Sequence, residues 1–95
     1  MFKLLYVYIL ECADGSYYVG VTNNPERRIV EHNAGINATA YTYTRRPVNQ
    51  VYVQDFRDFR KAIAWEKQLK KWRRQWKIEL IRKDNPEMKD LAEGW

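Results

Sequence analysis

The chain has 95 residues and a mass of 11.5 kDa, which leaves room for one domain, residues 1–95, and excludes two independent cores. Hydrophobic residues make up 45% of the chain, and this apolar content excludes an intrinsically disordered protein. The formal net charge of +5 favours a polyanionic partner. Nucleic acid is a better candidate for this partner than an anionic membrane surface.

The cysteine and histidine content excludes two common kinds of site. Cys12 and His32 are the only residues of their types, so the chain has neither an intrachain disulfide nor a Cys/His zinc site. No apolar run approaches the roughly 18 residues that a membrane span needs, and residues 1–10 lack the features of a secretion signal. We therefore expect a soluble, cytoplasmic protein without a membrane partner.

Residues 4–10 and 17–22 are predicted to form the two strands of a β-hairpin. The first is an uninterrupted apolar and aromatic run, which is typical of a strand that is covered on both faces and central in its sheet. The turn dipeptide Asp14-Gly15 lies between the two runs, as in many hairpins.

The length of the hairpin loop decides which side chains share a face of the sheet. If the loop spans residues 13–15, Leu10 pairs with Tyr18, and the side chains of Tyr8 and Tyr18 lie on the same face. A loop of two residues would place them on opposite faces. The register of the hairpin therefore bears on function if the two tyrosines act together.

The middle of the chain predicts a helix, a loop and a third strand. An Asn cap ahead of a proline begins a helix over about residues 24–34, and a glycine ends it. We expect Ile29 and Val30 to pack inward from this helix. Residues 36–47 have no helical period and predict an exposed loop, and a strand follows at about residues 48–55.

The C-terminal third predicts one long amphipathic helix that begins near Phe59. Its apolar stripe recurs at spacings of three and four, at Ala62, Trp65, Leu69, Trp72, Trp76 and Leu80. Glu66 lies at the border of this stripe, which makes it a partly screened carboxylate. The helix is expected to end at residues 84–86, and a short terminal helix is expected over residues 87–92.

Positive charge is concentrated in residues 60–83, which hold ten Lys or Arg and only two acids. Cations such as Lys70 and Arg73, interleaved with tryptophans, could neutralise the phosphates of a nucleic acid. A solvated basic face on a helix whose tryptophans fill the core would have the same sequence pattern. Both interpretations stay open at this stage.

Several polar residues have a functional and a structural interpretation. Arg28 and His32 lie one helical turn apart and could clamp a phosphate, or they could be surface residues that pair with an acid such as Glu31. Glu66 could act as a ligand, or it could form a helix salt bridge with Lys70.

The tyrosines have a similar ambiguity. Tyr8 and Tyr18 could be core aromatics with one polar end. A phenol acts as a general base near neutral pH only if a metal or an Arg stabilises its anion, and otherwise it orients a water.

The sequence contains no Gly-rich phosphate loop, Ser/His/Asp order or paired carboxylates, so most standard enzyme classes are excluded.

The ordered set of these residues resembles the GIY-YIG nuclease superfamily. The set consists of Tyr6-Val7-Tyr8, Tyr18-Val19-Gly20, Arg28, His32-Asn33 and Glu66. It is most similar to the small single-domain bacterial members, which resemble the nuclease domain of the excinuclease C subunit, and it extends to about Trp72. The first motif lacks its leading Gly and the second has Val for Ile, but both keep their tyrosines.

The resemblance implies an α+β fold with a small three-stranded antiparallel sheet flanked by helices, and cleavage of a DNA phosphodiester. It implies that Glu66 holds one Mg²⁺ or Mn²⁺ ion, since no second carboxylate stands at a matching position. Tyr8 would be the base or orient the water, Tyr18 would support it, and Arg28 would stabilise phosphate charge. His32 would assist the base or bind phosphate, and the order of proton transfer stays open.

Further residues are expected at the DNA interface. Gly20 would let the backbone approach the substrate closely. The loop resembles the Thr-Arg-rich stretch of the small members and would contact DNA through Thr42, Thr44, Arg45 and Arg46.

The predicted function is a metal-dependent, structure-selective DNA endonuclease linked to repair or recombination. Two alternatives remain, a nucleic-acid-binding module with little or no catalysis and a protein-interaction adaptor; the oligomeric state is not predicted.

Overall fold

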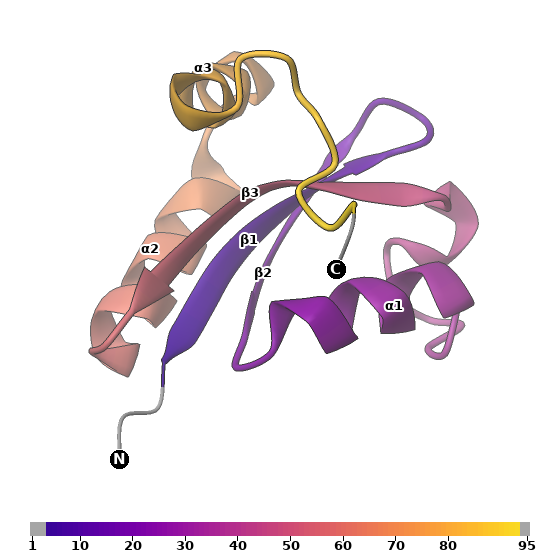
Figure 1. Cartoon of the computed structure of the whole chain (residues 1–95), viewed down its shortest axis with the longest axis horizontal. Coiled ribbons are helices and arrows are strands. Elements are labelled where there is room, and N and C mark those ends of the chain that lie inside the picture. The colour runs from indigo at the N-terminus through magenta and orange to yellow at the C-terminus, as the bar shows by residue number, and fades with distance from the viewer. Residues whose placement is uncertain (1–3, 94–95) are drawn as a thin grey trace.

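A three-stranded sheet with helices on both faces forms the molecule in the computed structural model, which describes residues 4–93 (Figure 1). The elements are β1 (Leu5–Cys12), β2 (Tyr17–Thr22), α1 (Pro25–Ala34), β3 (Val48–Phe56), α2 (Phe59–Lys71) and α3 (Arg74–Asp84). The strands are antiparallel in the order β2-β1-β3, so β1 is central, as its apolar run predicts. The predicted α+β fold is confirmed. Residues 1–3 and 94–95 of the predicted domain lie outside the described part.

The hairpin has the three-residue loop that places the two tyrosines together. Leu10 pairs with Tyr18 and Tyr8 pairs with Gly20 across β1 and β2. Gly15 has a φ of +83°, a left-handed conformation that favours glycine in the tight loop. Of the two registers that the sequence leaves open, the structure has the one with the three-residue loop, and Tyr8 and Tyr18 pack into the same layer on one face of the sheet.

Each face of the sheet has its own hydrophobic layer. Val7, Ile9 and Leu69 belong to the layer beneath α2 and α3, whereas Leu10 and Ile29 belong to the layer beneath α1. Apolar residues from both sides of β1 are thus removed from water, which stabilises each layer in proportion to the area buried. The site described below lies on the α1 face.

Helix α1 begins and ends as predicted but differs in one inward residue. The Asn24 side chain accepts a hydrogen bond from the Arg27 backbone at 3.0 Å, and Gly35 ends the helix with a φ of +68°. Ile29 is 6% exposed, whereas Val30 is 65% exposed. The inward prediction for Val30 is wrong because the next residue along a helix is rotated by about 100°, away from the sheet.

The segment 36–47 is more ordered than the exposed loop that its sequence predicts. It contains a short 3₁₀ helix at Tyr43–Arg45, and the Thr42 side chain is almost completely buried. Asn33 ties this segment to the sheet, because its side-chain amide donates to the Val48 carbonyl and accepts from the Val48 N–H. The loop is thereby held against the C-terminal end of α1.

The predicted single C-terminal helix is wrong, because the chain bends between α2 and α3. Trp72 and Arg73 have extended backbone, with ψ values of 147° and 153°. The apolar spacing continues through the bend because Trp72 packs edge-to-face against Trp65 on one side and Trp76 on the other. Arg74 donates to the Gly15 carbonyl and so fixes the start of α3 beside the hairpin loop.

The predicted helix over residues 87–92 is also wrong. The buried Asn85 side chain donates to the Val51 and Lys89 carbonyls, which fixes the turn after α3. Leu91 then donates its N–H to the Gln50 carbonyl at 2.7 Å. The segment around Leu91 therefore lies against β3, where Figure 1 draws it in yellow, and forms turns, such as the one closed by the Glu93 N–H and the Asp90 carbonyl, instead of a helix. None of the helices within residues 4–93 has the length and apolar character needed to cross a bilayer.

Candidate active site

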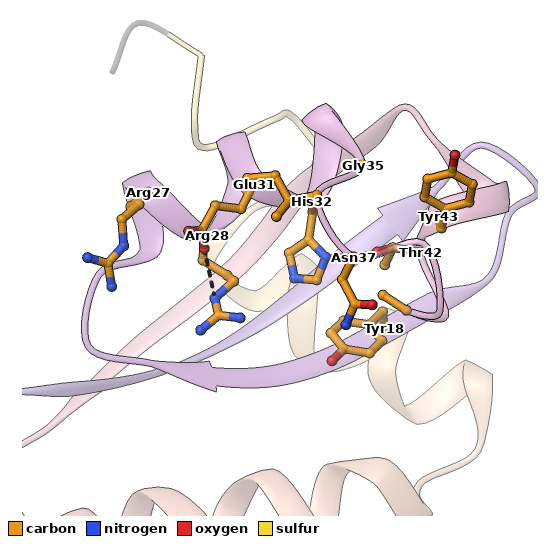
Figure 2. Close-up of a pocket in the computed structure, with 11 residues that line it drawn as sticks. Tyr18, Arg27, Arg28, Glu31, His32, Gly35, Asn37, Thr42 and Tyr43 are labelled. Atoms are coloured by element: carbon orange, nitrogen blue, oxygen red, sulfur yellow. Dashed lines mark hydrogen bonds and ion pairs between the residues drawn. The ribbon is translucent and has the colours of Figure 1, made fainter.

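A pocket of about 360 Å³ opens between α1, β2 and the loop that follows α1. Figure 2 shows Arg28 and His32 extending from α1 toward Tyr18 on β2, and Thr42 approaching from the loop. Arg27 extends away from this group, past the start of the helix. The helix, the edge strand and the loop thus each contribute polar side chains to one cleft.

A chain of hydrogen bonds passes from β1 through α1 to the loop. The Tyr8 hydroxyl lies 3.1 Å from His32 Nε2, and His32 Nδ1 lies 2.8 Å from Thr42 Oγ1. In the tautomer with the proton on Nδ1, the imidazole donates to Thr42 and accepts from Tyr8. Thr42 is 1% exposed, so its hydroxyl orients His32 and is not the exposed DNA contact that the loop pattern predicts.

Aromatic rings surround this chain. The ring of Tyr18 lies 6.3 Å from that of Tyr8 and 5.3 Å from that of His32, measured between centroids. Tyr41 stacks on Tyr18 at 6.0 Å, with 21° between the ring planes. Sequence analysis did not single out Tyr41, although an aromatic residue among Thr and Arg in a loop is a usual signal of base stacking.

Gly20 makes room for a neighbouring side chain. A Cβ atom at this position would lie 2.3 Å from the Tyr8 hydroxyl oxygen and 2.4 Å from the adjoining ring carbon. The missing side chain therefore leaves room for the Tyr8 ring, and close approach of a substrate to this backbone stays a prediction. A larger residue here would displace the phenol that bonds to His32.

The pKa values of the two hydrogen-bonded groups are shifted in opposite senses. Burial raises the pKa of Tyr8 far above its usual range; the nearby Tyr18 and Glu66 raise it further, and Arg28 opposes them. Burial lowers the pKa of His32, and the Arg28 charge adds to this effect. At neutral pH the phenol is therefore protonated and the imidazole is neutral.

Arg28 is the cationic side chain of the cleft that is best suited to bind a phosphate. Its Nε atom lies 3.6 Å from Glu31 Oε1, which confirms the predicted pairing with Glu31. The side chain is nonetheless 43% exposed, and its charge acts on both Tyr8 and His32. The guanidinium can therefore meet an anion in the cleft while it adjusts the charge of its neighbours.

Glu66 belongs to α2, on the other side of the sheet. Its side chain is 13% exposed and lies 3.0 Å from Lys70 Nζ, so the predicted salt bridge is confirmed. Its charge also raises the pKa of Tyr8, so the carboxylate acts on the same phenol as Arg28. An i, i+4 ion pair of this kind stabilises the protein by only about 0.3–0.5 kcal/mol. A more highly charged cation can therefore take the place of Lys70 beside the carboxylate.

The carboxylate at Glu66 fits one weakly coordinated divalent ion. Within residues 4–93 no group of three or more His, Cys, Asp or Glu side chains could form a metal centre. Mg²⁺ keeps several waters and often takes a single carboxylate together with phosphate oxygens. Glu66 thus suits a hydrated ion shared with a substrate phosphate and does not suit a closed protein cage.

The other predicted DNA contacts have mixed positions. Arg45 pairs with Asp14 at 3.0 Å and its guanidinium lies 3.8 Å over the Tyr41 ring, so it also supports the loop. Arg46 donates to the Tyr43 carbonyl at 2.7 Å. The remaining predicted contacts are exposed: Thr44, Lys70 and Arg73.

Comparisons with known proteins agree with this architecture. Residues 4–79 match the family model described as the GIY-YIG catalytic domain. A UPF0213 protein of Syntrophus aciditrophicus (strain SB) is 45% identical over 82 residues, which cover 86% of this chain and 93% of that protein. The UPF0213 protein SH2523 of Staphylococcus haemolyticus is 47% identical over 76 residues, which cover 80% of this chain and 92% of that protein.

Solved structures have the same fold. The solution NMR structure of the UPF0213 protein BH0048 from Bacillus halodurans has a TM-score of 0.61 and 34% identity, covering 96% of each chain. The solution NMR structure of the protein EF2693 from E. faecalis has a TM-score of 0.62 and 37% identity, covering 92% of this chain and 94% of that one.

Proposed function

The chain belongs to the GIY-YIG family, and we propose that it is a metal-dependent endonuclease that hydrolyses phosphodiester bonds in DNA. One observation carries the proposal: Arg28, His32 and Tyr18 line one cleft, and His32 lies within hydrogen-bond distance of the Tyr8 hydroxyl. The charges of Arg28 and Glu66 shift the pKa of Tyr8 in opposite senses, which agrees with a role for both near this phenol. A general base, an anion-binding cation and a carboxylate ligand are the parts that phosphodiester hydrolysis needs.

In the proposed reaction, proton transfer runs through the Tyr8–His32 hydrogen bond. The raised pKa of Tyr8 disfavours a free phenolate, so Tyr8 alone is a poor base in this state. A water at the Tyr8 oxygen instead passes its proton to Tyr8 while Tyr8 passes its own to His32 Nε2.

The developing charge is met by Arg28 and by the ion at Glu66. The Arg28 guanidinium offers a planar set of donors to the phosphate oxygens as negative charge builds on them. When bound at Glu66, a single Mg²⁺ or Mn²⁺ ion supplies further charge neutralisation on the phosphate. Tyr18 lines the cleft beside His32 and supports the position of the reacting group.

The small size of the domain favours recognition of DNA shape over sequence. The proposed site lies in a cleft at a sheet edge, which suits contacts to the nucleic-acid backbone better than the reading of base edges in a groove. We therefore propose a structure-selective enzyme that acts on branched or flapped DNA, as in repair or recombination.

A nicking assay on supercoiled plasmid and on branched DNA tests this function. Cutting should need Mg²⁺ or Mn²⁺ and stop in EDTA, and Arg28→Ala should reduce the rate by about 10²-fold or more, as loss of a transition-state donor does. Lys89→Ala removes the same charge from an exposed pair with Glu87 and should cut normally. Cutting that survives EDTA or Arg28→Ala would contradict the proposal.

A binding module without catalysis is the second candidate, because Lys70 already neutralises Glu66 in this structure. It predicts DNA binding that depends on salt, with no cutting of any DNA form at any metal concentration. The same assay therefore separates the two functions.

A further inference from the structure

A second hollow lies on the other side of Tyr18 from the candidate active site. It has a volume of about 270 Å³ and is lined by Tyr17, Tyr18, Val19, Tyr41, Lys70 and Lys77. Tyr18 is the one residue that lines both this hollow and the pocket beside Arg28 and His32. A ligand that extends past Tyr18 would therefore enter both.

Two lysines from different helices line this hollow, and Lys70 must leave its 3.0 Å pair with Glu66, or share its charge with it, to hold an anion there. Lys70 lies in the last turn of α2 and Lys77 in the first turns of α3, and the bend at residues 72–73 brings both helices to it. Lys77 is half-buried, and among the described residues it belongs to none of the ion pairs. A partly desolvated ammonium without an anionic partner is unfavourable, and a bound phosphate would remove that cost.

The lining of the hollow also includes part of an aromatic stack. Tyr41 is 43% exposed, and its ring stacks on Tyr18. The Arg45 guanidinium lies over the same ring at 3.8 Å, so a base that stacks on Tyr41 takes the place of this cation. An exposed tyrosine beside cationic side chains is the usual platform on which a nucleic-acid base stacks.

We propose that this hollow binds the nucleotide that neighbours the cleaved phosphodiester, with its phosphate between Lys70 and Lys77 and its base on Tyr41. The inference rests on the proposed endonuclease function and extends it to a second subsite. A free phosphate would use the lysines alone, whereas the aromatic wall suits an unpaired nucleotide. The site therefore favours DNA with a single-stranded segment next to the cut, such as a flap or fork.

Binding without cutting tests the subsite, with fluorescence anisotropy of a fluorescein-labelled forked DNA in EDTA. Lys77→Gln should weaken binding about tenfold at ~0.1 M salt. The slope of log K against log salt should become shallower by about 0.9 or less, which is the contribution of one neutralised phosphate. Lys89→Gln, an exposed lysine outside the hollow, should bind like the parent chain. Circular dichroism and thermal unfolding establish that each variant is folded.

The aromatic wall is tested separately with Tyr41→Leu and Tyr41→Phe. Leucine should weaken binding of the forked DNA by about fivefold or more, which is the smallest loss of affinity expected when one base no longer stacks. Phenylalanine should bind the forked DNA as tightly as the parent tyrosine. The loss should be much smaller for a fully paired duplex of the same length, because its bases are not free to stack.

The outcomes distinguish the two proposals. If the parent chain binds and cuts forked DNA but Lys77→Gln and Tyr41→Leu bind it unchanged, the subsite is wrong and the endonuclease function stands. If Lys77→Gln weakens binding of free inorganic phosphate and of forked DNA equally while Tyr41→Leu has no effect, the hollow is a phosphate site only. If the parent chain neither binds nor cuts DNA, both proposals fail.

Discussion

At the scale of single residues, the hydrogen bond between Tyr8 and His32 joins two groups with opposite pKa shifts. Burial favours the neutral form of each, a phenol with its proton and an imidazole with a free nitrogen. These shifts oppose a phenolate–imidazolium pair, so Tyr8 can pass its proton to the neutral His32 only while it takes another from the attacking water. The fraction of His32 that is neutral, and so able to accept a proton, should then set the pH dependence of cleavage.

We predict that the single-turnover cleavage rate at saturating metal rises with pH through a midpoint below about 6.5, the ordinary pKa of His32, and then levels off. The sign follows because a lowered pKa keeps His32 neutral, and able to accept a proton, down to more acidic pH. In His32→Gln the rate should be low and this acid limb should disappear. A midpoint above 6.5, or the same limb in His32→Gln, would show that another group accepts the proton.

The sequence allowed some site residues to be predicted and concealed others. The spacing of Tyr8 and Tyr18 around a turn dipeptide limits the hairpin to two registers, and the structure shows which of them places both tyrosines on one face. Thr42 and Tyr41 owe their positions to a loop that folds back on α1, and a loop without a period gives no signal of which residues it buries. Gly20 was noticed for its missing side chain, but only the structure identifies Tyr8 as the group that occupies the space.

At the scale of elements, the bend between α2 and α3 is the main feature that the sequence did not reveal. Periodicity detects a stripe of apolar residues, and the stripe continues because the tryptophans stack across the bend. Residues 72 and 73 are Trp and Arg, with no Gly or Pro to mark a helix end. The bend matters for function because it turns α3 toward the edge of the sheet that carries Tyr18.

The tryptophans at the bend should contribute unequally to stability. Trp72 packs on the core and contacts both neighbouring rings, whereas Trp76 is 49% exposed. Trp72→Ala should lower the free energy of unfolding by about 2–4 kcal/mol, somewhat less than for a wholly buried Trp. Trp76→Ala should cost about 1 kcal/mol or less. Urea denaturation measures both, and a larger loss for Trp76→Ala would contradict the packing described here.

At the scale of the whole molecule, the excess of positive charge lies on α2, α3 and the bend between them. Residues 60–83 hold ten Lys or Arg, and they include Lys70 and Lys77 beside the aromatic hollow. Trp65 and Trp72 pack on the core, so the interpretation in which the tryptophans fill the core is confirmed for these two. The cations around them remain exposed to a polyanion.

Affinity for forked DNA should therefore fall steeply with salt. Two phosphates lie on the proposed path, one at Arg28 and one between Lys70 and Lys77, and each neutralised phosphate contributes about 0.7–0.9 to the slope of log K against log salt. We expect a slope of about −1.5 to −2, measured by anisotropy in EDTA between ~50 and ~300 mM salt. A flat response would contradict phosphate contact and favour the protein-interaction adaptor.

The claim on which the whole account depends is that Glu66, from the opposite face of the sheet, completes the site around Tyr8. Its most direct test is the single-turnover cleavage of forked DNA by Glu66→Gln beside Glu79→Gln, the same change at an exposed position on α3. Glu66→Gln should bind DNA but cut it at least about 10²-fold more slowly in Mg²⁺, because the ligand for the ion is lost. Glu79→Gln should cut like the parent chain. Equal cutting by the two variants would contradict the account.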